Sequence, residues 1–280
     1  MRDPREVLDQ LDPAGPLIMG VLNATPDSFS DGGDWATADR AIAHAEAMLA
    51  DGADIIDVGG ESSRPGAHPV STIEELERTL PVIRALTDRC VVSIDTAKPE
   101  VAQAAIAAGA HIVNDITASL EHVAAEGRAG WVAMHMQGEP QTMQHDPTYD
   151  DVVREVGSDL ADAADRGRQA GIEHLWLDPG IGFGKSDRHN LELLRDLANL
   201  IPHGERLLVG VSRKRLIGEI HALSDQNGVK IATNDRREGS MVCSVWSWLR
   251  GAHIVRVHDV RTAALAMHYL RMWSDVDQDG

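Results

Sequence analysis

The sequence has little of several features that define other classes of protein. Of its 280 residues, two are cysteine and 4% are aromatic. No apolar run approaches the roughly 18 residues of a membrane-spanning helix, so we expect no transmembrane segment. The charged N-terminal segment does not resemble a secretory signal peptide, and we expect a cytoplasmic protein. Cys90 and Cys243 lie in apolar surroundings, which predicts two buried, reduced thiols.

Positive charge is also scarce. Lysine and arginine number 26 against 44 aspartate and glutamate residues, which gives a net charge of −18. This balance argues against nucleic acid and against anionic membrane surfaces as partners. A small anionic ligand remains compatible with it, because a local basic cluster can act against the overall sign. No HExxH pattern or paired Cys/His spacing occurs, so we expect no zinc site.

Short aliphatic runs, each followed by polar residues and then a helical pattern, recur along the chain. They predict eight strands that are buried on both faces: Leu17–Leu22, Ile55–Val58, Val91–Ile94, His111–Val113, Trp131–Met134, Leu175–Leu177, Leu207–Val211 and Ile254–Val257. Helices are predicted over Ala36–Ala50, Ser71–Leu86, Pro99–Ala108, Ser119–Glu126, Tyr149–Ala170, Asn190–Leu200, Arg237–Arg250 and Thr262–Met272.

Eight such units predict an α/β protein of the closed (β/α)8 barrel type, also called a TIM barrel, in a single domain. A Gly-Ala-X-Ile junction recurs before three strands, at Gly52, Gly109 and Gly251, as expected for repeated helix-to-strand units. An open doubly wound sheet is the alternative, but its GxGxxG turn is missing after the first strand. We expect residues 1–16 to be a loosely held lead-in, residues 17–273 the barrel, and residues 274–280 an acidic tail.

Polar residues stand at the carboxyl end of every predicted strand, and a barrel brings these ends together at one mouth. They are Asn23, Asp57, Asp95, Asn114, Asp115, His135, Asp178, Ser212, Arg213, Lys214, Arg256 and His258. A carboxylate that follows an apolar strand needs hydrogen-bond donors, which makes Asp95 and Asp178 the strongest candidates for a site. Asp54 and Asp57 can simply cap loops, the Ser-Arg-Lys run can be a solvated helix start, and His135 can be a satisfied, half-buried histidine.

Two segments rich in turn-forming residues, Ala24–Asp34 and Gly59–Pro69, are candidates for mobile covers over that mouth. Arg64 in the second segment could reach an anion.

The motifs NATPDSFSDGG, DVGGESSRPGA, VSIDT, VNDI, MHMQG, LDPGIGFGK, VSRKRLIG and VRVHDV occur in this order. Together they resemble the dihydropteroate synthase family of folate biosynthesis, the target of sulfonamides, over Leu17 to Met272. The resemblance implies a (β/α)8 barrel and a transferase. Its substrates would be 6-hydroxymethyl-7,8-dihydropterin diphosphate and p-aminobenzoate, and its products dihydropteroate and diphosphate.

The resemblance also assigns roles to residues. Asp95, Asn114, Asp178, Lys214 and Arg256 would bind the pterin. Asn23, Arg256, His258 and Mg²⁺ would hold the diphosphate, with Asn23 as the metal ligand. Phe29, Ser63, Arg64 and Pro65 would form the aminobenzoate pocket, and Asp31 would be the acid that closes the first loop.

The chain departs from the family pattern at three places. Ser63 stands where many members have threonine, Glu219–Asn234 is more polar than expected, and Met241–Leu249 carries more tryptophan. That last helix often forms the family's dimer contact, so the resemblance implies a homodimer. Three competitors are weighed against the synthase: a pterin-dependent methyltransferase barrel, a non-catalytic pterin-binding paralogue, and an aldolase that uses Lys214 as a Schiff-base nucleophile.

Overall fold

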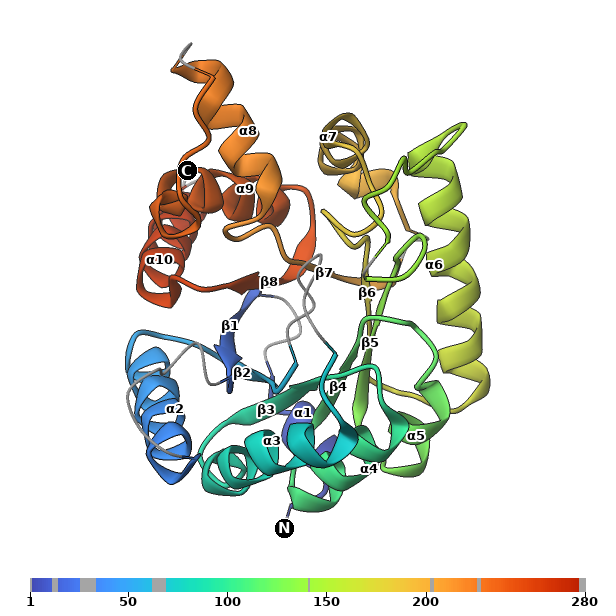
Figure 1. Cartoon of the computed structure of the whole chain (residues 1–280), viewed down its shortest axis with the longest axis vertical. Helices are drawn as coiled ribbons and strands as arrows, with labels where there is room; N and C mark the ends of the chain where they lie inside the picture. Colours follow the sequence, from blue (N-terminus) through green and yellow to red (C-terminus); the bar gives the residue numbers. More distant parts are fainter. Residues whose placement is uncertain are drawn as a thin grey trace.

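The chain folds into a closed barrel of eight parallel strands that are paired in the order of the sequence, with β8 returning to β1. A computed structural model describes residues 2–11, 15–25, 34–61, 69–140, 142–201, 204–225 and 228–276. Figure 1 shows the helices ringing the strands, with the sequence colours following one another around the ring. The predicted (β/α)8 barrel is confirmed.

All eight predicted strands form, with ends that differ by up to two residues. Their bounds are β1 Leu17–Asn23, β2 Ile55–Gly59, β3 Val91–Asp95, β4 Ile112–Asp115, β5 Gly130–Met134, β6 Leu175–Asp178, β7 Arg206–Val209 and β8 Ala252–Val257. Several strands extend to the polar residue that follows the apolar run, because the ladder pairs their backbones up to Asn23 with Gly59 and Asp95 with Asn114. These pairings place the polar residues at one level of the barrel.

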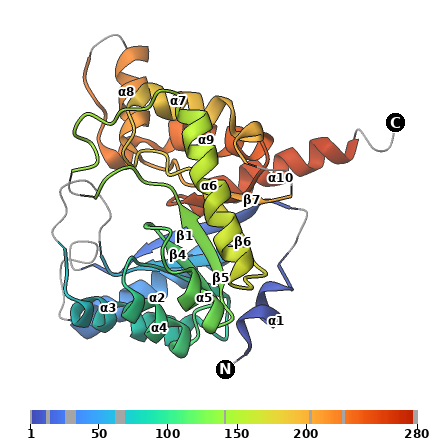
Figure 2. The same cartoon turned by 90° about the vertical axis from the view of Figure 1, so that its right-hand side faces the viewer.

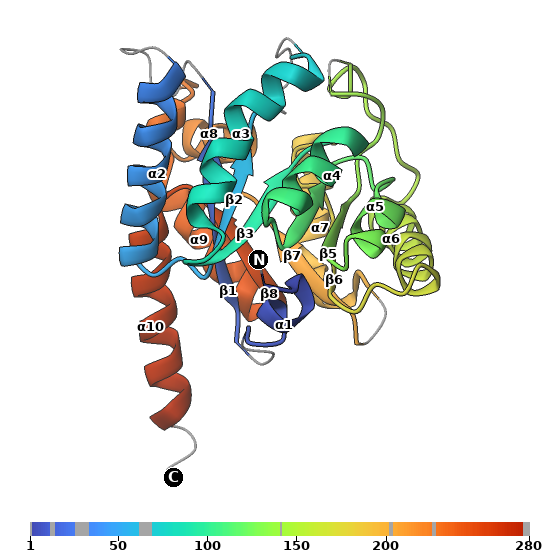
Figure 3. The same cartoon turned by 90° about the horizontal axis from the view of Figure 1, so that it is seen from below.

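The helices are α1 Pro4–Leu8, α2 Asp34–Ala50, α3 Thr72–Leu86, α4 Pro99–Ala108, α5 Glu121–Glu126, α6 Val152–Gln169, α7 Asp187–Arg195, α8 Arg215–Ser224, α9 Arg237–Leu249 and α10 Val260–Val276, with short 3₁₀ turns η2 Leu197–Asn199 and η3 Thr233–Asp235. No described helix is long and apolar enough to cross a membrane. Figures 2 and 3 show the end of α10 extending away from the barrel.

Helix ends follow local capping signals. Ser71 caps α3 by accepting a hydrogen bond from the Glu74 backbone N–H, as its spacing predicts. α7 begins earlier than predicted because Ser186 and His189 form a reciprocal capping box. The predicted Asn190–Leu200 helix breaks after Arg195 into η2. α8 was not predicted, because its polar end hides the buried face of Leu216 and Ile217.

At the end of the barrel where the strands begin, the interior is filled by apolar residues and closed by α1. Val7 and Leu8 of α1 pack with Trp176 and with one inward residue from most strands. The Arg5 side chain pairs with Glu173, and Arg128 pairs with Asp3. The expectation of a loosely held lead-in is therefore wrong for these residues, because α1 removes two apolar side chains from water. The opposite end, where the strands finish, is left to the polar side chains.

Candidate active site

A charged network lies at the carboxyl ends of β2, β3, β4 and β8. Arg256 donates from Nε to Asp57 Oδ2 at 2.7 Å and from Nη2 to Asp95 Oδ2 at 2.7 Å. Asn114 donates from Nδ2 to the same Asp57 oxygen at 3.0 Å. Four strands therefore meet through one guanidinium and two carboxylates. Asp115, the neighbour of Asn114, instead accepts from the backbone of its own turn and from Trp131 Nε1, so its role is structural.

Asp57 and Asn114 are buried, and Asp95 and Arg256 are partly buried, so the network is largely shielded from water. Burial raises the pKa of Asp95 to about 7, with Arg256 opposing the shift and Asp57 adding to it. Burial alone would lower the pKa of Arg256, but the negative charges of Asp57 and Asp95 hold this pKa above its usual range. The guanidinium is thus permanently charged, whereas Asp95 can gain or lose a proton near neutral pH.

Asp178 and Lys214 lie on the other side of the mouth. Asp178 is 4% exposed, and its Oδ1 accepts from the Gly180 backbone N–H at 2.8 Å. Burial raises its pKa, and Lys214, the Gly180 hydrogen bond and Arg256 oppose the rise. The Lys214 ammonium contacts the Ile181 carbonyl oxygen and stands 4.5 Å from the centroid of the Phe183 ring. Burial lowers the pKa of Lys214 to about 8, with Asp178 acting in the opposite direction.

The turn that carries Lys214 contains one residue in the left-handed backbone region and is held in place by hydrogen bonds of Arg213 and Arg236. Arg213 has φ +61°, which is uncommon for a residue with a side chain. Its Nη2 pairs with Asp259 at 3.1 Å, and its backbone N–H donates to Ser240 Oγ at 3.0 Å. Arg236 donates to the carbonyl oxygens of Arg213 and Lys214 at 3.0 and 3.2 Å. These contacts fix where the Lys214 side chain starts.

His258 and Asn23 complete the described part of the predicted site. The Nδ1 atom of His258 lies 3.1 Å from Ser212 Oγ, and His258 lines a hollow of about 260 Å³ beside Arg237 and Arg261. Asn23 ends β1 and is partly exposed. The other predicted residues, Phe29, Asp31, Ser63, Arg64 and Pro65, lie outside the described residues.

No cluster of three or more histidine, cysteine or acidic side chains suited to a metal occurs among the described residues. The donor that the sequence singles out for Mg²⁺ is the single amide oxygen of Asn23. An amide oxygen is a hard ligand of the type that Mg²⁺ accepts, and Mg²⁺ commonly completes its shell with substrate phosphate and water. The residues present therefore fit a metal that arrives with a phosphorylated ligand.

Sequence reasoning placed Asp57 at the mouth but gave it no role in the site, and it missed Lys185. Asp57 is fully buried and partners Arg256, so it does not simply cap a loop. Lys185 is fully buried beneath the β6–α7 loop and binds His135. A carboxylate within the apolar run IIDV was a signal for Asp57, whereas Lys185 gave none. His135 is a satisfied buried histidine, as its simpler interpretation held, and Asp54 does cap a backbone, that of Ile18.

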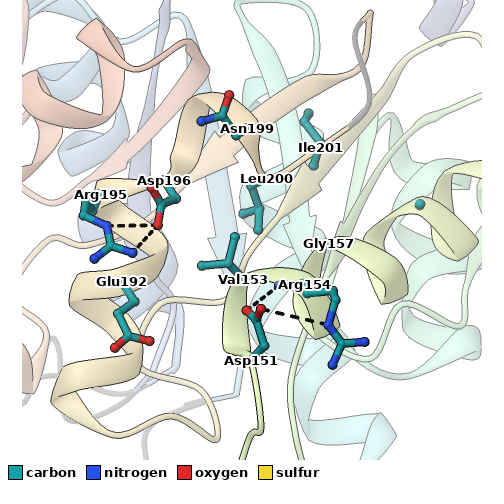
Figure 4. A pocket seen from close by; sticks show the side chains of 11 residues that line it. Asp151, Val153, Arg154, Gly157, Glu192, Arg195, Asp196, Asn199, Leu200 and Ile201 are labelled. Atoms are coloured by element: carbon teal, nitrogen blue, oxygen red, sulfur yellow. Dashed lines mark hydrogen bonds and ion pairs between the residues drawn. The ribbon is translucent and has the colours of Figure 1, made fainter.

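A larger hollow of about 650 Å³ lies on the outside of the barrel between α6 and α7 (Figure 4). Its charged side chains pair with their neighbours, Arg195 with Asp196 and Arg154 with Asp151. Surface pairs of this kind contribute little and offer few open partners to a ligand. The barrel mouth, where charged groups from several strands converge, is therefore the candidate site.

The fold and the mouth together define a (β/α)8 barrel protein with a cluster of shielded, charged side chains at the carboxyl ends of its strands. Residues 19–258 match the family described as "Pterin binding enzyme". The dihydropteroate synthase of Escherichia coli (strain K12) is 47% identical over 92% of this chain and 91% of its own length. That of Mycobacterium leprae is 41% identical over 91% and 93%.

Solved structures agree. Yersinia pestis dihydropteroate synthase with a sulfonamide drug complex superposes with a TM-score of 0.85 at 42% identity, over 95% of this chain and 96% of the other. The Xanthomonas albilineans enzyme with 4-aminobenzoic acid gives 0.84 at 41% identity, over 94% of each chain. The chain belongs to the dihydropteroate synthase family of pterin-binding enzymes.

Proposed function

We propose that this chain joins 6-hydroxymethyl-7,8-dihydropterin diphosphate to p-aminobenzoate, giving 7,8-dihydropteroate and diphosphate for folate biosynthesis in the cytoplasm. The observation that carries the proposal is the mouth of the barrel. There Asp178 and Lys214 interact electrostatically with the network of Asp95, Asn114 and Arg256, so that acids, an amide and two cations converge at one end of the barrel. Membership of the family supplies the reaction that such a site performs.

Asp178 is proposed to recognise the pterin edge. A pterin presents a 2-amino group beside N3–H, two parallel donors that match the two oxygens of a carboxylate. Oδ1 of Asp178 already accepts from Gly180, which fixes the plane of the group. Lys214 favours its ionised form and would itself donate to the pterin carbonyl and N5. Asp95 and Asn114 would meet the remaining polar edges of the ring.

Arg256 is proposed to cover the pterin ring and reach the diphosphate. Its Nε and one Nη are already held by Asp57 and Asp95, so the plane of the guanidinium is set before a ligand arrives. His258 and Asn23 would bind the same leaving group. Mg²⁺ held by Asn23 and phosphate oxygens would neutralise charge on the diphosphate as it departs. The arylamine is already a nucleophile at neutral pH, so the chain needs no general base of the serine-histidine type.

The aminobenzoate pocket is proposed from the resemblance. Phe29, Ser63, Arg64 and Pro65 would contact the second substrate, and Asp31 would close the first loop. The Xanthomonas albilineans relative has been solved in complex with 7,8-dihydropteroate, at 38% identity and a TM-score of 0.81 over 95% of each chain. A barrel of this family can thus hold both halves of the product together.

A homodimer is proposed through α9. Val242 and Leu249 on this helix are 68% and 65% exposed, and Trp246 is 39% exposed. Such apolar side chains on one helix favour burial against a second copy. Sedimentation velocity of the chain should give the mass of two copies, and Val242→Glu should reduce it to one.

The reaction itself is tested directly. The protein is incubated with pterin diphosphate, Mg²⁺ and labelled p-aminobenzoate, and labelled dihydropteroate is the expected product. Omission of Mg²⁺ should abolish the signal. A folded protein that binds pterin and forms no labelled product would instead be a non-catalytic paralogue. A methyltransferase barrel would need neither the SSRPG segment nor the Ser-Arg-Lys run, and both are present in this sequence. A Schiff-base aldolase is less favoured because the Lys214 ammonium contacts a carbonyl oxygen and Phe183.

A further inference from the structure

Lys185 is a buried lysine that the proposed reaction leaves without a role. It follows the β6–α7 loop, residues 179–184, and its side chain is fully buried under that loop. Lysine is rarely buried to this degree without partners. Its partners all belong to the loop itself or to His135, which directly follows β5.

The hydrogen bonds of Lys185 account for all the donors of an ammonium group. Nζ lies 2.9 Å from the Phe183 carbonyl oxygen, 3.1 Å from the Gly180 carbonyl oxygen and 2.9 Å from His135 Nδ1, with the His135 carbonyl oxygen as a longer fourth contact at 3.4 Å. An ammonium has three N–H donors, and a neutral amine has two. His135 must then accept at Nδ1, which leaves its Nε2–H to face Asp159 Oδ2 at 3.2 Å. The arrangement is complete when Lys185 is charged and His135 is neutral.

The loop above Lys185 has little freedom of its own. Gly180 and Gly184 have φ values of +63° and +59°, and a Cβ at either would stand 1.9 Å or 2.2 Å from a carbonyl oxygen of residue 135 or 137. Glycine is required at both positions, because the loop backbone lies directly on the backbone after β5. Lys185 stabilises this contact because its ammonium bonds both to the loop and to His135.

The same loop makes the contacts that orient two pterin-site residues. The Gly180 N–H fixes Asp178, and the Ile181 carbonyl oxygen accepts from Lys214. The Phe183 ring lies under the Lys214 ammonium. The backbones of Gly180 and Phe183 are therefore held by Lys185 on one side and serve the pocket on the other.

We propose that Lys185, in its charged form and paired with neutral His135, is a positioning residue that shapes the β6–α7 loop so that Asp178 and Lys214 can bind the pterin. Lys185 does not contact the ligand in this arrangement. The inference rests on the proposed pterin site and adds a second layer to it.

The surrounding charges make the ammonium sensitive to pH. Burial lowers the pKa of Lys185 to about 7, with Asp178 and Asp159 opposing the shift and Lys214 adding to it. Burial and the charge of Lys185 lower the pKa of His135 to about 3, so His135 stays neutral. Lys185 therefore loses the third donor that the loop requires as the pH rises through about 7.

The test compares Lys185→Met, which keeps the length of the side chain and removes its donors, with Leu160→Ala. Leu160 lies in the core on α6 and contributes to stability alone. The readouts are the Kd of pterin-6-carboxylate by calorimetry and the melting temperature. We expect both variants to melt earlier. Only Lys185→Met should weaken pterin binding, by at least about tenfold, which corresponds to about 1.4 kcal/mol.

Repeating the titrations across pH separates positioning from general loosening. The ratio of the variant Kd to the wild-type Kd should shrink from about tenfold near pH 6 to below about threefold near pH 8.5, because wild-type Lys185 loses its charge over that range. Ionisation of the ligand affects both proteins and cancels in the ratio. A ratio that stays constant, or a Lys185→Met protein with wild-type affinity, overturns the proposal.

A second variant covers the case in which Lys185→Met does not fold. His135→Leu removes one acceptor and leaves the two loop carbonyls, and it should raise the pterin Kd at least about threefold. Unchanged affinity in this variant would also overturn the pairing. If the wild-type protein itself binds no pterin, the proposed function fails rather than this inference.

Discussion

Replacing Asp57 by asparagine tests whether the charged network of β2 and β8 stabilises the fold as well as the site. The Oδ2 atom of Asp57 accepts from Arg256 and Asn114, whereas Oδ1 is buried without a hydrogen-bond partner among the described residues. An asparagine can keep its oxygen toward Arg256. Its NH₂ group then occupies the Oδ1 position and has no acceptor there.

The magnitude follows from these contacts. Loss of the charge-assisted part of the Arg256 hydrogen bond contributes about 1 kcal/mol, and a buried N–H without an acceptor contributes about 1–3 kcal/mol. We therefore expect the Asp57→Asn variant to lose about 2–4 kcal/mol of unfolding free energy. At about 2 °C per kcal/mol for a chain of this size, the melting temperature should fall by roughly 4–8 °C.

The assay is urea unfolding with calorimetry, and the matched control is Asp54→Asn, immediately before the same strand. Asp54 is exposed and accepts from the Ile18 backbone N–H at 2.7 Å, at the end of the barrel away from the mouth. The control should lose less than about 1 kcal/mol. Equal stability of Asp57→Asn and wild type would refute the reasoning, since it would mean that Arg256 does not depend on Asp57 for its charge partner.

Four further outcomes are expected. Asp178→Asn should weaken pterin binding most among single changes at the mouth, by about 1–3 kcal/mol in calorimetry, because a donor would face a donor. Arg64→Ala should reduce turnover far more than binding of a pterin without diphosphate, and an equal loss would contradict its placement on a loop. Gly184→Ala should lower the melting temperature, since its Cβ would meet the Gln137 carbonyl oxygen at 2.2 Å. Burial lowers the pKa of His111 to about 4, so the free energy of unfolding should decrease as the pH is lowered from about 6.5 to about 4. His111→Gln should flatten that part of the plot of unfolding free energy against pH.

The order of strands and helices was predictable because one local pattern repeats. Aliphatic runs flanked by glycine and polar residues predict buried parallel strands, and eight of them close a barrel. The failure to predict helix α8 has a physical reason. Its buried face is Leu216, Ile217 and Ala222 on one side of an otherwise polar segment, and the packing against Arg236 and α9 decides its conformation. Tertiary contacts of this kind are not visible in a local window.

The members of the mouth were predictable, but their pairings were not. Asp95 and Asn114 directly follow predicted apolar strands and Arg256 lies near the end of the last one, so their level in the barrel follows from the fold. That Arg256 is shared between Asp57 and Asp95 depends on the direction in which a long side chain leaves β8. The burial of Lys185 could not be predicted from the sequence, for a related reason. A lysine after a glycine-rich loop is usually solvated, and only the left-handed turns at Gly180 and Gly184 direct it inward.

The charge balance of the mouth also bears on where the diphosphate is held. Among the described residues Arg256 is matched by Asp57 and Asp95, and Lys214 acts on Asp178. A neutral pterin ring can bind at a mouth whose positive and negative charges are already paired, because it leaves none of them without a partner. A diphosphate cannot, because it adds negative charge and the cations of the barrel wall already have acidic partners. Departure of the diphosphate therefore requires additional positive charge, which the proposal gives to Mg²⁺ beside Asn23, Arg256 and His258.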